Sequence, residues 1–592
     1  MGPLRRAWNR SALLSLLAAG LCLGAPGRAE DAADKLRVSV EGLEGELRAN
    51  ALAFLGIERF DGKAAPSVER LRWLHQQAEE ELRRALQPFG YYRPHIDSSL
   101  EHDAAGWRAR YRVVPGEPVR IASLRLELAG EARQDPAYQR LLANPPLRQG
   151  EVLVHARYEQ LKSELQSLAA ERGYFDARLV ESRVRVDLAA YRADVMLRFD
   201  SGPRYRLGEV RFSDTPLDPD LLRRYLTLEP GEPYQASRLL ELQSDLIASE
   251  YFEQVMVNAS PDQAGPDRTL PVTVDLEMRK RNLYTFGLGY GTDTGMRGKA
   301  SVERRWINRR GHRLKGEMLA SQIKQNLSAE YIIPGADPRT DSYNARIGYQ
   351  AEDSDVKDSQ TALLGVSYVR QDGKWRKTLS LDYLWEKFKI GEDEQESKLL
   401  LPGAQWSRVE ADDRLFVTRG YRLDLSLRGA YEPLLADVSF LQARMSGKWV
   451  VPLWAEGRML LRGDLGTTWV VDDADFQRIP TSLRFYAGGD NSVRGYSLDS
   501  IGPRDAEGEV VGGRHLLVGS LEYEHRIAEK WSMAAFVDAG DAFDSATPEL
   551  KTGVGLGVRW RSPVGPVRVD LASGLDEPGD SVRLHLTIGP DL

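Results

Sequence analysis

The feature that most constrains this chain is an alternation of apolar and polar residues that begins after Lys280 and continues to Ile588. Runs of 10 to 14 residues carry the alternation, and turns rich in Gly, Asp, Asn and Pro separate them. In residues 421–428, for example, Tyr and Leu occupy every second position and Arg, Asp and Ser occupy the others. A period of two predicts β-strands with one apolar face and one polar face.

Three features favour a transmembrane β-barrel over a soluble sandwich. The runs match the roughly 9–11 residues that a strand needs to cross a bilayer. Charged residues share the face opposite the apolar one, and nine of the 12 Trp follow residue 280, many near strand ends, where interfacial girdles belong. No run of 18 apolar residues occurs after residue 30, so no transmembrane helix is expected.

The count of alternating runs sets the size of the barrel. Sixteen runs start at Tyr284 and end at Ile588, which predicts a 16-stranded antiparallel barrel. An open sheet edge leaves backbone groups unpaired in hydrocarbon. We therefore expect the first strand (residues 283–290) to pair with the last (582–588).

The half that precedes the barrel repeats itself three times. Helical stretches end in aromatic doublets at Tyr91-Tyr92, Tyr174-Phe175 and Tyr251-Phe252, spaced by about 80 residues, and strands follow each doublet. Each repeat predicts a two-layer α+β module of one strand, a helical pair and two strands. We interpret the doublets as core, with a Gly before each as a helix C-cap. The expected modules are residues 30–117, 118–203 and 204–280, followed by the barrel at 281–592.

The first 29 residues resemble a secretory signal peptide. Basic residues at the start, an apolar stretch at residues 11–25 and small residues at Gly27 and Ala29 predict cleavage before Glu30. The only cysteine, Cys22, lies within this segment, so disulfides and zinc–thiolate sites are not expected beyond it. The formal net charge of −7 argues against a nucleic-acid partner.

One motif is specific enough to suggest a family. Residues 485–496 read Phe-Tyr-Ala-Gly-Gly-Asp-Asn-Ser-Val-Arg-Gly-Tyr and lie between the eleventh and twelfth runs. This segment resembles the sixth-loop signature of the outer-membrane assembly superfamily that includes BamA, TamA and the two-partner secretion pores. Residues 536–540, 553–560 and 562–566 resemble its C-terminal strand motifs, and the repeats resemble its POTRA modules. Three modules directly after the signal segment are similar to the TamA subfamily.

The resemblance implies a loop that folds into the barrel lumen and is held there by its arginine. The loop motif is Val493, Arg494, Gly495 and Tyr496. A guanidinium in a confined lumen needs carboxylates, and by resemblance these are Glu522 and Asp538, which fall on the polar phase of their strands. The alternative is that Arg494 is a solvated loop charge and the two acids are ordinary lumen residues.

The resemblance further implies a non-enzymatic factor in the bacterial outer membrane with its POTRA modules in the periplasm. It would assist the assembly and secretion of autotransporter-type and other β-barrel clients through a weak seam between the first and last strands. The implied partners are unfolded outer-membrane proteins, outer-membrane lipid and a TamB-like inner-membrane-anchored protein, with no cofactor and no metal. The expected seam residues are Gly287, Gly289, Leu584, Leu586, Gly589 and Pro590.

Other functions remain open at this point. A BamA-like general assembly factor and a two-partner secretion pore share the motifs, whereas a porin lacks the repeats. The chain has no His-Glu-x-x-His and no Gly-x-Ser-x-Gly, and its eight His are scattered, so an enzyme is not expected. Glycines in the first strand also serve barrel curvature, which makes them weak support for a seam.

Overall fold

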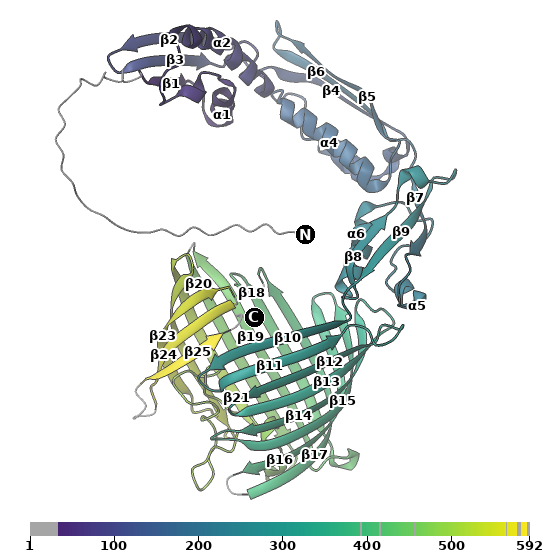
Figure 1. Ribbon diagram of the computed structural model, residues 1–592, viewed down its shortest axis with the longest axis vertical. Coiled ribbons are helices and arrows are strands. Elements are labelled where there is room, and N and C mark those ends of the chain that lie inside the picture. The colour runs from purple at the N-terminus through teal and green to yellow at the C-terminus, as the bar shows by residue number, and fades with distance from the viewer. Residues whose placement is uncertain are drawn as a thin grey trace, which may run out of the picture. The chain divides into compact units, whose positions relative to one another are not determined.

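The computed structural model describes residues 34–390, 393–413, 416–454, 456–563, 565–576 and 582–588. The predicted signal peptide and the seam residues Gly589 and Pro590 lie outside these ranges. The chain divides into two compact units, one ending at Arg204 and the other starting at Tyr205 (Figure 1). Among the described residues, no helix is both long enough and apolar enough to cross a membrane.

Three α+β modules precede the barrel, as the repeats predict, and each has the order strand, two helices, two strands. The first contains β1 (Leu36–Glu41), α1 (Gly45–Phe54), α2 (Val68–Leu86), β2 (His95–Asp103) and β3 (Gly106–Val114). The second contains β4 (Arg120–Ala129), α3 (Pro136–Ala143), α4 (His155–Arg172), β5 (Arg178–Asp187) and β6 (Arg192–Asp200). The third contains β7 (Arg206–Phe212), α5 (Pro219–Arg223), α6 (Ala236–Ala248), β8 (Phe252–Asn258) and β9 (Thr269–Met278).

All three sheets share one topology, in which the last strand lies in the middle. The orders are β1-β3-β2, β4-β6-β5 and β7-β9-β8, with the first strand parallel and the second antiparallel to the central one. The helices cover one sheet face because their apolar residues recur at helical spacing. In α2, Leu71, Leu74 and Leu82 are fully buried in this way, and the Ser67 hydroxyl caps the helix by accepting from the Arg70 amide.

The aromatic doublets lie at the ends of the helical pairs and are buried to different degrees. Tyr174, Tyr251 and Phe252 are buried, whereas Tyr92 is half-buried and packs against the core of the second module. Gly90 and Gly173 adopt the left-handed conformation that ends a helix. The third repeat departs from this prediction because Glu250, not glycine, takes the positive φ before its doublet.

The second half is a 16-stranded antiparallel sheet in which each strand pairs with its sequence neighbours, as the alternation predicts. Its strands are β10 (Asn282–Gly291), β11 (Gly295–Arg304), β12 (Arg313–Ser321), β13 (Lys324–Pro334), β14 (Asp341–Asp353), β15 (Asp358–Asp372), β16 (Trp375–Ile390), β17 (Asp393–Ala411), β18 (Gly420–Ala430), β19 (Phe440–Trp454), β20 (Gly457–Val470), β21 (His515–Ala528), β22 (Trp531–Phe543), β23 (Lys551–Ser562), β24 (Gly565–Gly574) and β25 (Arg583–Ile588). Large apolar side chains such as Phe286, Leu288 and Leu364 are exposed on the outer wall, and charged ones such as Glu522 and Asp538 are buried on the inner side. This wall suits hydrocarbon outside and a polar lumen inside.

The seam between β10 and β25 differs from the expectation of a continuous ladder. Within the described residues no backbone ladder joins the two strands, although they meet at the seam (Figure 1). Side chains supply part of the missing bonding: the Leu586 amide donates to Thr292 Oγ1 at 3.0 Å, and Arg297 Nη2 donates to the Ile588 carbonyl at 3.5 Å. The barrel is therefore nearly closed, with its two edge strands held by side chains instead of a sheet.

The third module is fastened to the barrel at two turns between strands. The Tyr251 hydroxyl donates to the carbonyl of Gly311, which lies between β11 and β12, at 2.5 Å. Arg224 donates to the carbonyl of Gly335, which lies between β13 and β14, also at 2.5 Å. The Tyr251 side chain is buried, and this module and the barrel belong to the same compact unit.

Candidate functional site

The loop that joins β20 to β21, residues 471–514, turns inward and fills part of the lumen. Isolated bridges pair Phe485 with Gly513 and Ala487 with Ile501, so the loop is a narrow hairpin. Its apolar residues, among them Val493 and Tyr496, pack against Val518 and Ala542 of the barrel wall. The motif thus lies against the inner wall and not in solvent.

Arg494 is surrounded by carboxylates from three wall strands. Its Nε and Nη2 donate to the two oxygens of Asp538 on β22 at 2.7 and 3.0 Å, which makes a bidentate pair. Its Nη1 donates to Glu522 on β21 at 2.7 Å and to Asp570 on β24 at 3.2 Å. The backbone amide of Arg494 adds a bond to Asp538 at 3.1 Å. All four side chains are buried, so the solvated-loop alternative does not describe this structure.

Sequence reasoning missed three members of this cluster. Asp570 is one, and Arg559 on β23 is another: its Nη2 donates to Glu522 at 2.7 Å and its Nη1 to Asp570 at 2.5 Å. Phe536 is the third, with its ring centroid 3.4 Å from the guanidinium carbon of Arg494. All three lie at inward-facing positions of their strands. The alternation of the sequence could therefore have placed them in the lumen, but not in contact with Arg494.

The glycines of β23 are explained by the close approach of the loop and of Phe536 to this strand. Gly553 and Gly555 face inward, and a Cβ on Gly553 would collide with the Arg494 carbonyl. A Cβ on Gly555 would collide with the Phe536 ring. These glycines therefore make room for the loop and for the ring beneath its arginine.

The residues on either side of Arg494 also depend on close packing. Gly495 has φ +98°, and a Cβ there would lie 2.6 Å from the Gly574 amide nitrogen on β24. The hydroxyl of the next residue, Tyr496, lies 3.2 Å from the Thr552 carbonyl oxygen and 3.2 Å from the Asp576 amide nitrogen. The motif is thus in contact with the wall along its whole length.

A second anchor holds the start of the loop. Glu386 on β16 is fully buried and accepts from the Thr481 hydroxyl and the Ser482 amide, both at 3.0 Å. Gln442 on β19 donates to the Leu483 carbonyl at 2.7 Å. The loop is therefore fixed on two stretches of the wall, by β16 and β19 at its start and by β21, β22 and β24 at the motif.

The expected seam residues that the structure describes lie on β10 and β25. Leu586 lies beside Thr292, since its amide bonds Thr292 Oγ1. Gly287 belongs to the inward phase of β10 and Leu586, like Leu584, to the outward phase of β25, since the exposed Phe286 and the buried His585 define the two phases. Gly289 lies next to Arg297, whose side chain fills its inner face.

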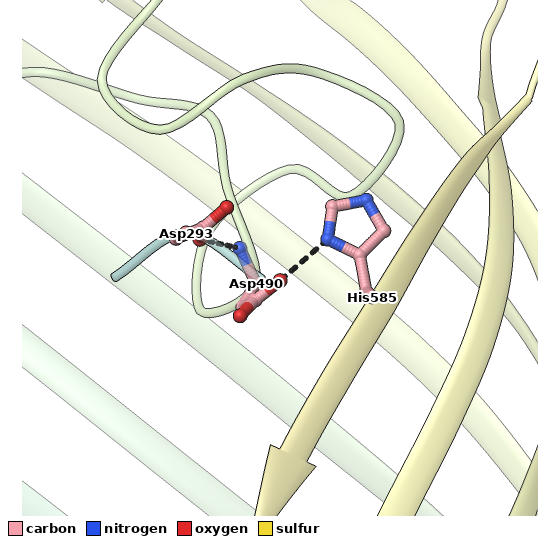
Figure 2. A group of neighbouring side chains, drawn as sticks. All are labelled: Asp293, Asp490 and His585. Atoms are coloured by element: carbon pink, nitrogen blue, oxygen red, sulfur yellow. Dashed lines mark hydrogen bonds and ion pairs between the residues drawn. The ribbon is translucent and has the colours of Figure 1, made fainter. Parts of the chain in front are cut away.

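One further group joins the loop to the seam. Asp293 from the β10–β11 turn, Asp490 from the loop and His585 from β25 have side-chain ligand atoms within 4.8 Å of one another (Figure 2). Asp490 lies four residues before Arg494, so this group and the arginine cluster belong to one contact region.

Comparison with known proteins identifies the family. Residues 282–591, more than half of the chain, match the Omp85 superfamily domain. The chain belongs to the Omp85 superfamily. Residues 37–115 match the POTRA domain described as TamA domain 1, and residues 205–279 match a POTRA domain described as surface antigen variable number repeat.

Curated relatives are outer membrane protein assembly factors named BamA. The protein from Nitratidesulfovibrio vulgaris is 23% identical over 397 residues, covering 62% of this chain and 49% of the relative. The one from Neorickettsia risticii is 24% identical over 470 residues, covering 74% of this chain and 61% of the relative. The chain thus spans about half to three fifths of the length of these relatives.

A solved structure agrees with the fold. BamA from Haemophilus ducreyi lacking POTRA domains 1–3 superimposes with a TM-score of 0.68 at 18% identity, covering 80% of this chain and 99% of that one. As in other Omp85 proteins with POTRA domains, the barrel lies in the outer membrane and the modules lie in the periplasm.

Proposed function

We propose that this Omp85 protein is a TamA-type insertion and translocation factor that assembles autotransporter-type and other β-barrel clients through the seam between β10 and β25. The observation that carries the proposal is the absence of a backbone ladder between these strands in the described part of the barrel. Each strand then has one edge whose N–H and C=O groups are not paired in a ladder, and such an edge is a template for an incoming strand once the side-chain bonds at Leu586 and Ile588 break. A client segment would pair with such an edge as it enters the membrane.

Crosslinking tests whether the seam opens during assembly. Cross-strand partners share a face, so we pair Tyr290→Cys with Leu586→Cys or Ile588→Cys, since all three side chains point outward; Cys22 lies in the predicted signal peptide. A disulfide at the seam should stop client assembly, and reduction should restore it. The matched control joins Val569→Cys to Leu586→Cys across the intact β24–β25 ladder, and it should leave assembly unchanged. If a locked seam assembles clients normally, lateral opening is not the mechanism.

The TamA assignment concerns the partner. The match of residues 37–115 to a TamA-type POTRA domain supports it, and we propose that this module binds a TamB-like inner-membrane-anchored protein. In the three-stranded sheet β1 and β2 are the outer strands, and a free strand edge is a site for β-augmentation. Deleting residues 30–117 should abolish co-purification of the partner while the barrel keeps its heat-modifiable mobility on gels. Retained co-purification would refute this assignment.

A BamA-like general assembly role is the second candidate, and the curated relatives named BamA favour it. The two roles differ in which proteins co-purify with the full-length chain. A BamA-like factor would co-purify with outer-membrane assembly components in the absence of a TamB-like protein. Loss of the TamB-like partner in a knockout strain should instead remove the activity of a TamA-type factor.

A further inference from the structure

We propose that His585 is the central residue of a latch that ties the lumenal loop to both edge strands of the seam. The latch consists of Thr292 and Asp293 from the first hairpin, Asp490 and Gly495 from the loop, and His585 from the last strand. The latch itself is a property of the resting barrel. Its consequence for client entry rests on the function proposed above.

The contacts form a continuous chain of hydrogen bonds across the seam. The Asp490 amide donates to Asp293 at 2.7 Å, and the Thr292 hydroxyl lies 3.1 Å from Asp490 Oδ1. The Nδ1 atom of His585 lies 2.5 Å from the same carboxylate oxygen (Figure 2). The Gly495 amide donates to His585 Nε2 at 3.0 Å. Since no ladder joins the described parts of β10 and β25, these bonds are a main connection between the two edges.

The partners of His585 determine its tautomer. Nε2 accepts from a backbone N–H, so it carries a lone pair and no proton. The ring proton therefore lies on Nδ1, where it is donated to Asp490. His585 is 3% exposed, and both of its nitrogens have the partner that this neutral form requires.

The same geometry argues against a metal ion, although the three side chains are of the types that bind metals. A metal would take the lone pair of Nδ1, but Nδ1 holds the proton. A metal-bound histidine turns its other nitrogen toward an acceptor as a donor, whereas here Nε2 faces the Gly495 N–H. The acids around His585 are Asp490, Asp293 and its cross-strand neighbour Asp570, and Asp570 is already paired with Arg494 and Arg559.

The latch couples the loop motif to the state of the seam. Arg494 holds the loop on β21, β22 and β24, and the next residue, Gly495, holds it on β25. The last strand can leave the first hairpin only when the bonds at His585 and Thr292 break. Opening the seam at this end therefore requires the loop to release either β25 or the first hairpin, and a displaced loop removes the bonds of Asp490 and Gly495 from the seam.

Hydrogen exchange of the full-length protein in lipid discs tests the coupling at the Gly495 and Leu586 amides. His585→Phe fills the space without hydrogen bonds and should speed exchange at both amides about tenfold or more, the effect of one hydrogen bond of ordinary strength. His515→Phe is the matched control, because His515 is also a barrel histidine with a hydroxyl partner, Thr467, at 3.0 Å. It should leave both amides unchanged. Because Gly495 bonds His585 directly, faster exchange at Gly495 with an unchanged Leu586 would overturn the latch.

A second pair of variants tests cooperativity without touching the histidine. Thr292→Val removes the acceptor of the Leu586 amide, and it should also speed exchange at Gly495, which Thr292 reaches only through Asp490 and His585. Thr292→Ser keeps the hydroxyl and should preserve both rates. An unchanged Gly495 in Thr292→Val would refute the coupling. Chelation by EDTA should have no effect; if it reproduced the His585→Phe pattern, the group would be a metal site and the latch would be wrong.

Discussion

Replacing Arg494 by alanine should displace the loop from the barrel wall. The structure indicates which of the three carboxylates loses most of its charge compensation. The arginine makes its bidentate bond to Asp538, with single bonds to Glu522 and Asp570. Arg559 still pairs with Glu522 and Asp570 after the substitution. Asp538 keeps Arg462, at 3.8 Å, as a charged partner, and the backbone amide of residue 494, at 3.1 Å. One fully buried carboxylate is thus left nearly uncompensated.

The expected loss of stability of the seated loop follows from the number of carboxylates that lose their arginine. Breaking a buried ion pair by removing one partner costs about 3–5 kcal/mol. Because two of the three acids retain Arg559, we expect the lower end, about 3 kcal/mol, or roughly two orders of magnitude in the equilibrium between seated and displaced loop. Arg494→Lys should recover only part of this, since an ammonium cannot form the bidentate pair.

The assay is the fraction of barrel that keeps its folded mobility on gels after heating, measured beside client assembly. Arg494→Ala should lower the temperature of the transition and impair assembly. Adding Asp538→Asn should recover most of the heat resistance without restoring assembly. Adding Glu522→Gln should recover little, because Glu522 is already paired with Arg559, which would lose one of its carboxylate partners. Equal rescue by the two acids, or wild-type behaviour of Arg494→Ala, would refute this account of the cluster.

Three further predictions concern other parts of the chain. Gly495→Ala should displace the motif, because the new Cβ meets the β24 backbone, and the folded mobility should be lost at lower temperature than in the wild type. Glu386→Ala should free the start of the loop, at a cost of about 1–3 kcal/mol for the donors left unpaired, and protease should then cleave near residue 481. In the second module, burial lowers the pKa of His155, whose ring bonds the Tyr92 hydroxyl at 2.6 Å. The unfolded state then binds more protons, so this histidine's contribution to stability should be lost as pH falls below about 6.5. The protection factors of the α4 amides, which correct for the slower intrinsic exchange at low pH, should fall between pH 7.5 and pH 5.5, and should fall less in His155→Phe.

The sequence by itself determined the architecture because the periods of its side chains are local properties. Alternation after Lys280 fixes strands with one apolar face, and only a closed or nearly closed barrel satisfies such strands in hydrocarbon. The repeats before it fix three α+β modules for the same reason, since each amphipathic helix needs one sheet face to cover. The phase of β21 and β22 likewise fixed Glu522 and Asp538 as inward residues.

Only the tertiary structure decided how the loop and the seam are held. Asp570 and His585 were visible as inward residues, but their distance in sequence from Arg494 and Asp490 says nothing about contact. The pairing of two edge strands is equally undetermined by alternation, because period two specifies which face a residue occupies and not which residue lies opposite. Thr292 and Arg297 bond the Leu586 amide and the Ile588 carbonyl, which a ladder would otherwise pair, and Asp490 of the loop bonds the His585 side chain beside them. That exchange of backbone bonds for side-chain bonds depends on three segments meeting in space, and no local pattern encodes it.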